Sequence, residues 1–241
     1  MTRQPDAAIL VATAHSPSFH QLYDLLRKYK DPYLVGVDRG ALKLIHRGLM
    51  PELAVGDFDS VTVHEKKLIK QQSMNYQEAD NRKDDTDLEL ALAAVQERLP
   101  TLRNYYIFGG IGSGNHQGRI DHLLGNIWLG FQPRFQDILD QLTFVEDDSI
   151  IKYYGPGDHE LHARHHQQYL SIFTLGSVKN LSIQKAAYPL APQDIDYPKA
   201  FLSNHFLNSQ RPIALSFDQG KVLVIWQLEN PPNHHRPNFF R

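Results

Sequence analysis

The feature of the sequence that most constrains the fold is an alternation of short apolar runs with helix-length segments, which continues to about residue 147. The apolar runs typical of strands are Ala8–Ala12, Tyr33–Val37, Leu53–Gly56, Tyr105–Phe108 and Leu142–Val145, with a weaker candidate at Met74–Gln77. Helical spacing of apolar residues marks the segments 18–30, 39–48, 62–72, 87–98 and 120–131. This alternation predicts a mostly parallel sheet with helices on its faces, and ligands of such sheets bind beyond the carboxyl ends of the strands.

The helical spacing ends at about residue 149, and short strand-like runs separated by turns replace it. These runs are Ser149–Tyr154, Glu160–Ala163, Tyr169–Phe173, Val178–Ile183, Ile213–Phe217 and Val222–Trp226. Their spacing predicts a small antiparallel sandwich or barrel. We therefore predict an α/β protein with a mostly parallel catalytic domain at 1–147, an all-β sandwich domain at 148–230 and a flexible tail at 231–241.

The composition excludes several classes of function. The chain of 241 residues has a net charge of −2 and no long basic run, so we expect neither nucleic acid nor a membrane as a partner. It has no cysteine, which excludes disulfides, thiolate metal sites and a cysteine nucleophile. The apolar stretch at 8–14 is interpreted as a first strand rather than a signal peptide, and a chain without cysteine fits a reducing compartment, so we expect a cytoplasmic location.

The first candidate site is a pair of carboxylates, Asp57 and Asp59, directly after the predicted strand Leu53–Gly56. If the chain stays extended, residues at i and i+2 project to one side, and such a pair suits a hard cation such as Mg²⁺. The alternative is a polar turn in which Asp59 or Ser60 caps the next helix.

The second candidate is the acidic segment 83–89, at the start of a predicted helix. Thr86 and Glu89 have the spacing of a capping box with Thr86 at the N-cap, which gives both residues a structural role. That role leaves Asp84, Asp85 and Asp87 unexplained. They either stabilise the helix N-terminus or bring further carboxylates to a shared metal ion.

The third candidate is the glycine loop, residues 109–119, between a predicted strand and a predicted helix. Its five glycines in ten residues free backbone N–H groups to approach phosphate oxygens, and Arg119 adds a forked donor. The loop matches neither the Walker pattern nor G-x-G-x-x-G. Phosphate binding is the favoured interpretation, and a flexible surface loop is the alternative.

Together, these motifs resemble those of the thiamine pyrophosphokinase family, in the same order along nearly the whole chain. The matching segments are Val37–Ala41 with Gly48–Ser60, then Lys83–Asp87 with Glu89–Leu92, then Gly118–His122 with Asn126, and finally Tyr188–Leu190 and Ser203–Asn204. The chain departs from the family pattern in a longer glycine loop, in Gln117 where glycine is common, and in His205 after the Ser-Asn pair.

The resemblance implies an N-terminal α/β catalytic domain, a C-terminal β-sandwich and a homodimer, with thiamine bound between domains of different subunits. It also implies a Mg²⁺-dependent transfer of pyrophosphate from ATP to the hydroxyl of thiamine, which gives thiamine diphosphate and AMP. The residues alone imply only a magnesium ion and a polyphosphate.

The resemblance also assigns roles to individual residues. It implies that Mg²⁺ is held by Asp57, Asp59, Asp84 and Asp87. Phosphate and nucleotide contacts are implied for Arg119, Arg39, Lys83, Thr86, Gly110, Gly112, Gly118 and His122. Asp38 is implied to contact the metal or the nucleotide, and Asp121 to orient Arg119, the water ligands of the metal or the substrate. Thiamine contacts are implied for Tyr188, Ser203 and Asn204.

Two other functions compete with this prediction. The segment Asp57–Val61 also fits D-x-D-x-[TV], the nucleophile motif of haloacid-dehalogenase-like phosphatases, in which the carboxylate of Asp57 would attack phosphorus and Asp59 would act as the acid. That motif normally lies near the start of a chain, whereas here two predicted strand–helix units precede it. A nucleotide-sensing binding module would bind ATP without turnover, and it gives no reason for so many carboxylates.

Overall fold

The computed structural model describes residues 4–12, 19–80, 84–112, 120–165 and 167–228. The chain divides into two compact units, Met1–Glu146 with Ile151–Gly155 and Asp147–Ile150 with Pro156–Arg241. The predicted tail at 231–241 lies outside the described residues. The longest described helix has 12 residues, and no helix in the described part of the chain has the length and apolar character to cross a bilayer.

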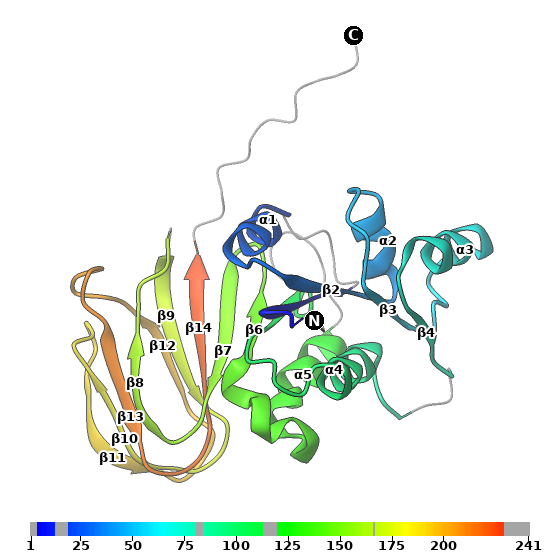
Figure 1. Cartoon of the computed structure of the whole chain (residues 1–241). Coiled ribbons are helices and arrows are strands. Elements are labelled where there is room, and N and C mark those ends of the chain that lie inside the picture. The colour runs from blue at the N-terminus through cyan, green and yellow to red at the C-terminus, as the bar shows by residue number, and fades with distance from the viewer. Residues whose placement is uncertain (1–3, 13–18, 81–83, 113–119, 166, 229–241) are drawn as a thin grey trace. The chain divides into compact units, whose positions relative to one another are not determined.

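A parallel sheet with the strand order β6-β5-β1-β2-β3-β4 forms the centre of the first unit (Figure 1). Its strands are β1 (Ala7–Val11), β2 (Pro32–Val37), β3 (Leu53–Gly56), β4 (Tyr76–Glu78), β5 (Tyr105–Phe108) and β6 (Leu142–Val145). Strand β7 (Ser149–Tyr154) lies beside β6. Every residue of β1 is buried, because helices cover both faces of the sheet, and this explains its uninterrupted apolar sequence. The predicted α/β class is confirmed.

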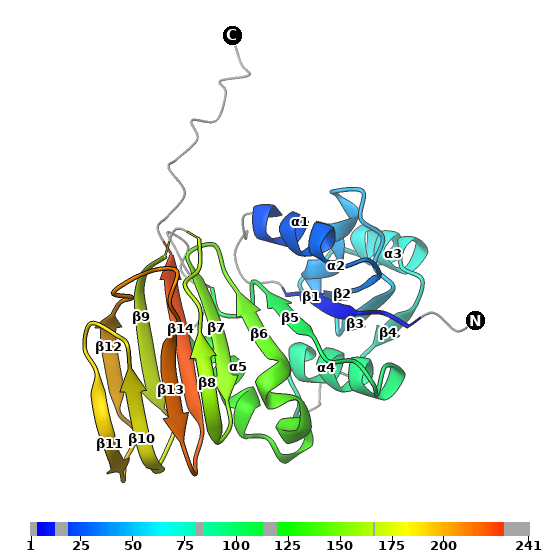
Figure 2. The same cartoon turned by 60° about the vertical axis from the view of Figure 1, so that its left-hand side comes forward.

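Helices cover the two faces of this sheet (Figures 1 and 2). On one face lie α1 (Phe19–Lys28), α2 (Arg39–Ile45) and α3 (Val63–Gln72), and on the other α4 (Asp87–Arg98) and α5 (Ile120–Trp128). The predicted helix at 120–131 is α-helical only to Trp128 and continues in the 3-10 segments η1 (Leu129–Phe131) and η2 (Pro133–Gln141). Neither Asp59 nor Ser60 caps α3: its N-cap is Thr62, which forms a capping box with Glu65.

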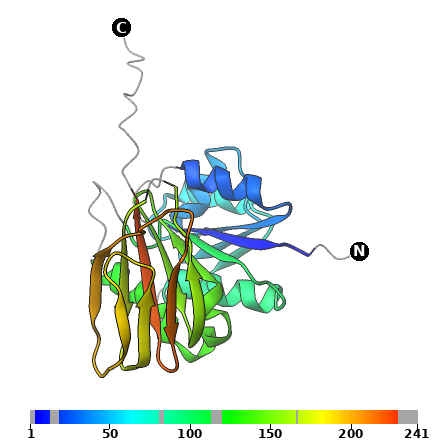
Figure 3. The same cartoon turned by 90° about the vertical axis from the view of Figure 1, so that its left-hand side faces the viewer.

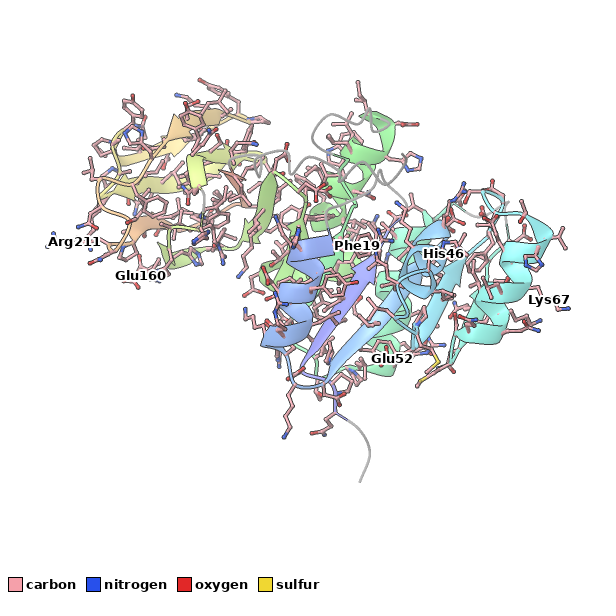
Figure 4. The ribbon with its side chains drawn as sticks, turned by 90° about the horizontal axis from the view of Figure 1, so that it is seen from above. Phe19, His46, Glu52, Lys67, Glu160 and Arg211 are labelled. Carbon is pink, nitrogen blue, oxygen red and sulfur yellow. The ribbon has the colours of Figure 1, made fainter. Side chains whose placement is uncertain are left out.

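Two clusters of buried apolar side chains hold α1, α2 and α3 on the sheet. One includes Phe19 of α1, labelled in Figure 4, and the guanidinium of Arg47 lies 3.4 Å from the centre of its ring. The other includes Phe58, Ile69 and Ala54 from the strand β3 and the segments that follow it. The second cluster therefore packs directly beneath the acidic residues that follow β3.

Two antiparallel sheets form the second unit, with the strand orders β12-β9-β14 and β11-β10-β13-β8 (Figure 3). The strands are β8 (Gly157–Leu161), β9 (Gln167–Thr174), β10 (Val178–Gln184), β11 (Leu190–Ile195), β12 (Ala200–Asn204), β13 (Ile213–Phe217) and β14 (Val222–Leu228). This arrangement confirms the predicted all-β class. The prediction missed β11 and β12, since most of their side chains are exposed or half-buried and give no apolar alternation.

Candidate active site

The carboxylates that follow β3 lie on a turn. Phe58 has φ 56°, a left-handed conformation, and its ring is 2% exposed and stacked on Tyr76 with 4.9 Å between centroids. Burial of that ring turns the backbone, and the N–H of Asp59 donates to Oδ1 of Asp57 at 3.1 Å. The extended path that we considered for Asp57 and Asp59 is therefore wrong. Asp57 is half-buried and Asp59 is exposed.

Asp38 follows β2 and is joined to the same turn. Its backbone has φ 48°, and Oγ of Ser60 donates to its Oδ2 at 2.8 Å. Arg39 donates from Nη1 to the carbonyl of Ser60 at 3.3 Å. A Cβ on Gly56 would lie 2.9 Å from Cα of Asp38, so only glycine fits where the ends of β2 and β3 meet. Ser60 thus connects two strand ends, and Asp38 and Arg39 lie beside the carboxylate turn.

The acidic segment 83–89, at the start of α4, forms both a helix cap and an ion pair. The predicted capping box is confirmed, because the N–H of Glu89 donates to Oγ1 of Thr86 at 3.2 Å and the N–H of Thr86 donates to Oε2 of Glu89 at 2.6 Å. Asp85 accepts two hydrogen bonds from Arg134, at 2.8 and 2.9 Å. Asp85 is therefore engaged in a bidentate ion pair, which leaves exposed Asp84 and half-buried Asp87 as the site candidates of this segment. Lys83 lies outside the described residues.

The first residues of the glycine loop follow β5. A Cβ on Gly110 would lie 2.8 Å from Cγ2 of Ile107, so the side chains beneath the loop require glycine there. Gly112 has φ 73°, a conformation that glycine adopts without strain. The N–H of Ile111 donates to Oε1 of Glu146 at 2.8 Å. Gly118 and Arg119 lie outside the described residues.

Helix α5 carries Asp121 and His122 in its first turn, and both residues are exposed. Oδ1 of Asp121 accepts the N–H of His122 at 3.0 Å. A carboxylate at this end of a helix is favoured by the helix dipole. Asn126, one turn further along, is buried and donates from Nδ2 to the carbonyl of Gly110. The third motif therefore contributes both exposed polar groups and a buried contact to the glycine loop.

The parallel sheet brings these groups to one edge. Val11 of β1 pairs with Gly36 of β2 and with Phe108 of β5, and the registers of β3 and β6 continue the same alignment. Asp38, Asp57, the glycine loop and Glu146 therefore follow the carboxyl ends of neighbouring strands, where ligands of such sheets bind.

Lys43 of α2 is a basic residue near this edge that no sequence motif indicated. Burial lowers the pKa of its ammonium group below the ordinary value, and the positive charges of Arg47 and Arg39 lower it further. The negative charge of Glu146 acts in the opposite direction and raises this pKa.

Within the described residues, no three histidine, aspartate or glutamate side chains are grouped closely enough to hold a metal ion by themselves. Mg²⁺ does not require such a group, because it is commonly bound through one or two carboxylates together with substrate phosphates and water. The carboxylate oxygens of Asp57 and Asp59 on one turn, of Asp84 before α4 and of Asp87 at the first residue of α4 are of the kind that Mg²⁺ prefers. The donor set fits a cation that arrives with a nucleotide.

The residues of the second unit that the resemblance singles out lie near the end of β12. Asn204 is 2% exposed, and its side chain accepts the N–H of Tyr188 at 3.0 Å and donates to the carbonyl of Tyr188 at 2.8 Å. The ring of Tyr188 is 62% exposed and meets His205 edge-on at 5.6 Å. Ser203 is exposed, with φ 56°. Asn204 thus fixes the backbone of Tyr188, and Tyr188 and Ser203 present side chains to solvent.

Comparison with known proteins matches both halves of the chain. Residues 26–139 match the family model of the thiamin pyrophosphokinase catalytic domain, and residues 158–222 match that of the thiamin pyrophosphokinase vitamin B1 binding domain. Over 193 residues the chain is 30% identical to the thiamine pyrophosphokinase of Bacillus subtilis, and this aligned region covers 79% of this chain and 85% of that protein.

Solved structures agree with these matches. A thiamin pyrophosphokinase family protein from Enterococcus faecalis superposes with a TM-score of 0.81 at 36% identity, over 92% of this chain and 98% of that one. The crystal structure of the Bacillus subtilis thiamine pyrophosphokinase superposes with a TM-score of 0.76 at 26% identity, over 92% and 99%. The two family models, the curated relative and the shared fold lead to one conclusion: the chain belongs to the thiamin pyrophosphokinase family of transferases.

Proposed function

We propose that the chain transfers the pyrophosphoryl group of ATP to the hydroxyl of thiamine, with Mg²⁺, and releases AMP and thiamine diphosphate. One observation carries this proposal. Carboxylates follow the carboxyl ends of β2, β3 and β6, and the glycine loop follows β5 of the same parallel sheet, in a unit whose sequence matches a thiamin pyrophosphokinase catalytic domain. Carboxylates beside a phosphate-binding loop are what transfer from a nucleotide requires.

The residues that would hold Mg²⁺ are Asp57, Asp59, Asp84 and Asp87. The chemistry supplied by the ion is neutralisation of the phosphate oxygens, which otherwise repel an incoming hydroxyl. The chain's own contribution is to place these carboxylates: the buried ring of Phe58 fixes the turn that carries Asp57 and Asp59, and the capping box fixes the start of α4.

The phosphates would be held by the glycine loop. We assign backbone N–H groups at Gly110, Gly112 and Gly118 and the guanidinium of Arg119 to the phosphate oxygens. The remaining assignments on the nucleotide side are Asp38, Arg39, Lys83, Thr86 and His122, and Asp121 would orient Arg119, the water ligands of the metal or the substrate. Asp38 and Arg39 are supported by their position beside the carboxylate turn, since Ser60 connects them to it.

Thiamine would bind to the second unit, at Tyr188, Ser203 and Asn204. The exposed ring of Tyr188 offers an aromatic face to a flat heterocycle. Both polar ends of the Asn204 side chain already bond to the backbone of Tyr188, so its part in binding is to orient that residue.

We further propose a homodimer in which each site takes its carboxylates from one chain and its thiamine contacts from the other. Exposed apolar side chains in both units support it. On α5, the exposed side chains of Ile120, Leu124 and Trp128 recur every four residues and form one stripe, and exposed apolar patches of this kind mark interaction surfaces. In the second unit the side chains of Tyr188, Tyr197, Leu202 and Leu207 are exposed. A cytoplasmic location is proposed because ATP is available there.

The proposed reaction is tested by incubating the protein with ATP, Mg²⁺ and thiamine and separating the products. AMP and thiamine diphosphate should form in equal amounts. ADP with thiamine monophosphate would contradict pyrophosphoryl transfer. Free phosphate formed without thiamine would instead identify a phosphatase, and nucleotide binding without products would identify a sensing module.

The metal assignment is tested with Asp57→Asn and Asp87→Asn, which remove a charge and nearly keep the shape. Turnover should fall by about a hundredfold or more, as expected for loss of a key electrostatic group, with little change in melting temperature. Asp140→Asn, at an exposed position in η2, is the matched control and should keep parental turnover. If either site variant keeps most of its activity, that residue is not a metal ligand.

The shared site is tested with mixed dimers of two inactive variants, Asp87→Asn and a chain with Ser203 and Asn204 both changed to alanine. In a mixed dimer one site carries both defects and the other carries neither. Random exchange makes about half of the dimers mixed, so roughly a quarter of parental activity should return. A proven mixed dimer without recovery would show that each site lies within one chain.

A further inference from the structure

Glu146, which directly follows β6, is a buried acid that no motif of the sequence predicts. It is 2% exposed, and its Oε1 accepts the N–H of Ile111 at 2.8 Å. A buried carboxylate is costly unless hydrogen bonds compensate it, and a bond from a backbone N–H to a charged acceptor is among the stronger ones. The side chain therefore binds the beginning of the glycine loop from the neighbouring strand end.

Asn126 binds the same part of the loop from the other side. It lies on α5, is 8% exposed, and donates from Nδ2 to the carbonyl of Gly110. The carbonyl of Gly110 and the N–H of Ile111 belong to one planar peptide unit. Because one side chain holds the C=O and the other holds the N–H, the two together fix the rotation of that plane.

This peptide unit has a particular need to be fixed. A Cβ at Gly110 would lie 2.8 Å from Cγ2 of Ile107 and 3.3 Å from the ring of Phe144, so the residue must be glycine. Glycine leaves the backbone with more accessible conformations than any other residue. On both sides of the unit the chain adopts left-handed conformations, with φ 67° at Gly109 and 73° at Gly112. The sequence of the loop by itself does not favour one orientation of this peptide.

We propose that Glu146 and Asn126 are a positioning pair that locks the Gly110–Ile111 peptide, and so preorganises residues 109–112, the described start of the glycine loop, for the phosphates of ATP. The inference rests on the proposed function, which assigns those phosphates to the loop. Neither side chain is a catalytic residue. Because the N–H of Ile111 already donates to Glu146, the phosphates would bind to other N–H groups of the loop.

The test compares Glu146→Ala with Glu146→Gln. Alanine leaves the N–H of Ile111 without its acceptor, whereas glutamine keeps a side-chain oxygen in reach. Affinity for MgATP, measured by calorimetry without thiamine, should weaken about tenfold or more in the alanine variant, since only the fraction of molecules with the correct peptide orientation binds. The glutamine variant should recover most of this loss. KM for thiamine should be the same in both variants.

Glu52 provides a matched control. It is also a buried acid that accepts a backbone N–H, from Leu34 at 2.6 Å, but it precedes β3 and so lies at the opposite end of the strand from the carboxylate turn (Figure 4). Glu52→Ala should lower the melting temperature without a selective effect on MgATP. If Glu146→Ala and Glu52→Ala weaken MgATP binding equally, or if glutamine recovers nothing at position 146, the positioning role is refuted.

Asn126→Ala gives an independent test and decides the question if Glu146→Ala does not fold. It should also weaken MgATP selectively. The double variant should lose less affinity than the product of the two single losses, because both side chains act on one peptide unit. If the losses of MgATP affinity in the two single variants multiply in the double variant, or if Asn126→Ala binds MgATP as tightly as the parent does, the two side chains do not act as a pair. If the unmodified protein forms no thiamine diphosphate, the proposed function is refuted. If the unmodified protein is active and every variant binds MgATP with unchanged affinity, only the positioning role of Glu146 and Asn126 is refuted.

Discussion

The left-handed backbone of Phe58 allows a sharp test of how the metal-side carboxylates are placed. The ring is buried in the cluster that includes Ile69, stacks on Tyr76, and holds the turn between Asp57 and Asp59. Replacing a buried phenylalanine by alanine typically costs about 3–5 kcal/mol. A left-handed conformation adds about 1–2 kcal/mol of strain for a residue with a Cβ, and glycine avoids that strain.

The test is the order of stability of Phe58→Ala and Phe58→Gly. At an ordinary position glycine is less stable than alanine by about 0.5–1 kcal/mol. At Phe58 the order should reverse, with the glycine variant as stable as the alanine variant or more stable by about 1 kcal/mol, because both lose the ring but only alanine keeps the strain. Urea unfolding followed by circular dichroism measures this difference directly.

Activity separates the turn from general stability. Ile69→Ala removes a fully buried side chain from the same cluster and should cost about 2–5 kcal/mol, without altering the backbone between the two aspartates. At a temperature where all variants are folded, Phe58→Ala should lower kcat much more than Ile69→Ala does. A glycine variant clearly less stable than the alanine variant, or equal losses of kcat at both positions, would refute the reasoning.

Three further predictions address other parts of the first unit. Arg134→Lys breaks the bidentate pair with Asp85, and because the side chains of this pair are about one-third exposed, stability should change by less than about 1 kcal/mol. The pair holds Asp85 between the proposed metal-side residues Asp84 and Asp87, so the Mg²⁺ concentration for half-maximal activity should rise several-fold, and an unchanged concentration would contradict a positioning role of the pair. Burial raises the pKa of Tyr153 above its ordinary value of 10.0, so the unfolded chain ionises first and stability is lost as the pH rises through 10. In urea unfolding, Tyr153→Phe should reduce the loss of stability between pH 9 and 11 by about 1.4 kcal/mol in total, and a constant difference from the parent would contradict it. Gly40→Ala places a Cβ 1.9 Å from a backbone carbonyl oxygen of β1 and should destabilise the protein by at least about 2 kcal/mol. At Gly125 a Cβ would have no atom within 4 Å, so Gly125→Ala should leave the melting temperature equal or higher. Equal effects of the two substitutions would contradict the close packing of α2 on β1.

Features that depend on near neighbours along the chain could be predicted from the amino-acid sequence. The alternation of apolar runs and helical segments predicted the parallel sheet, because periodicity reflects which faces of each element are buried. The spacing of Thr86 and Glu89 predicted a capping box that the structure confirms, since both partners lie within one turn of helix. The positions of Asp57 and of the glycine loop directly after strands followed from the same pattern.

The contacts between polar groups that are distant along the chain could not be predicted in this way, because they depend on the tertiary fold. Arg134 and Asp85 are 49 residues apart along the chain, and Ile111 and Glu146 are 35 residues apart, so no local spacing in the sequence predicts either contact. The left-handed turn at Phe58 is likewise invisible in the sequence, because a phenylalanine normally avoids that conformation and adopts it here only as its ring packs on Tyr76. Local preferences are set by the backbone and by near neighbours, whereas the partner of a buried charge is set by the way the strands and helices pack, which brings distant parts of the chain within hydrogen-bond distance.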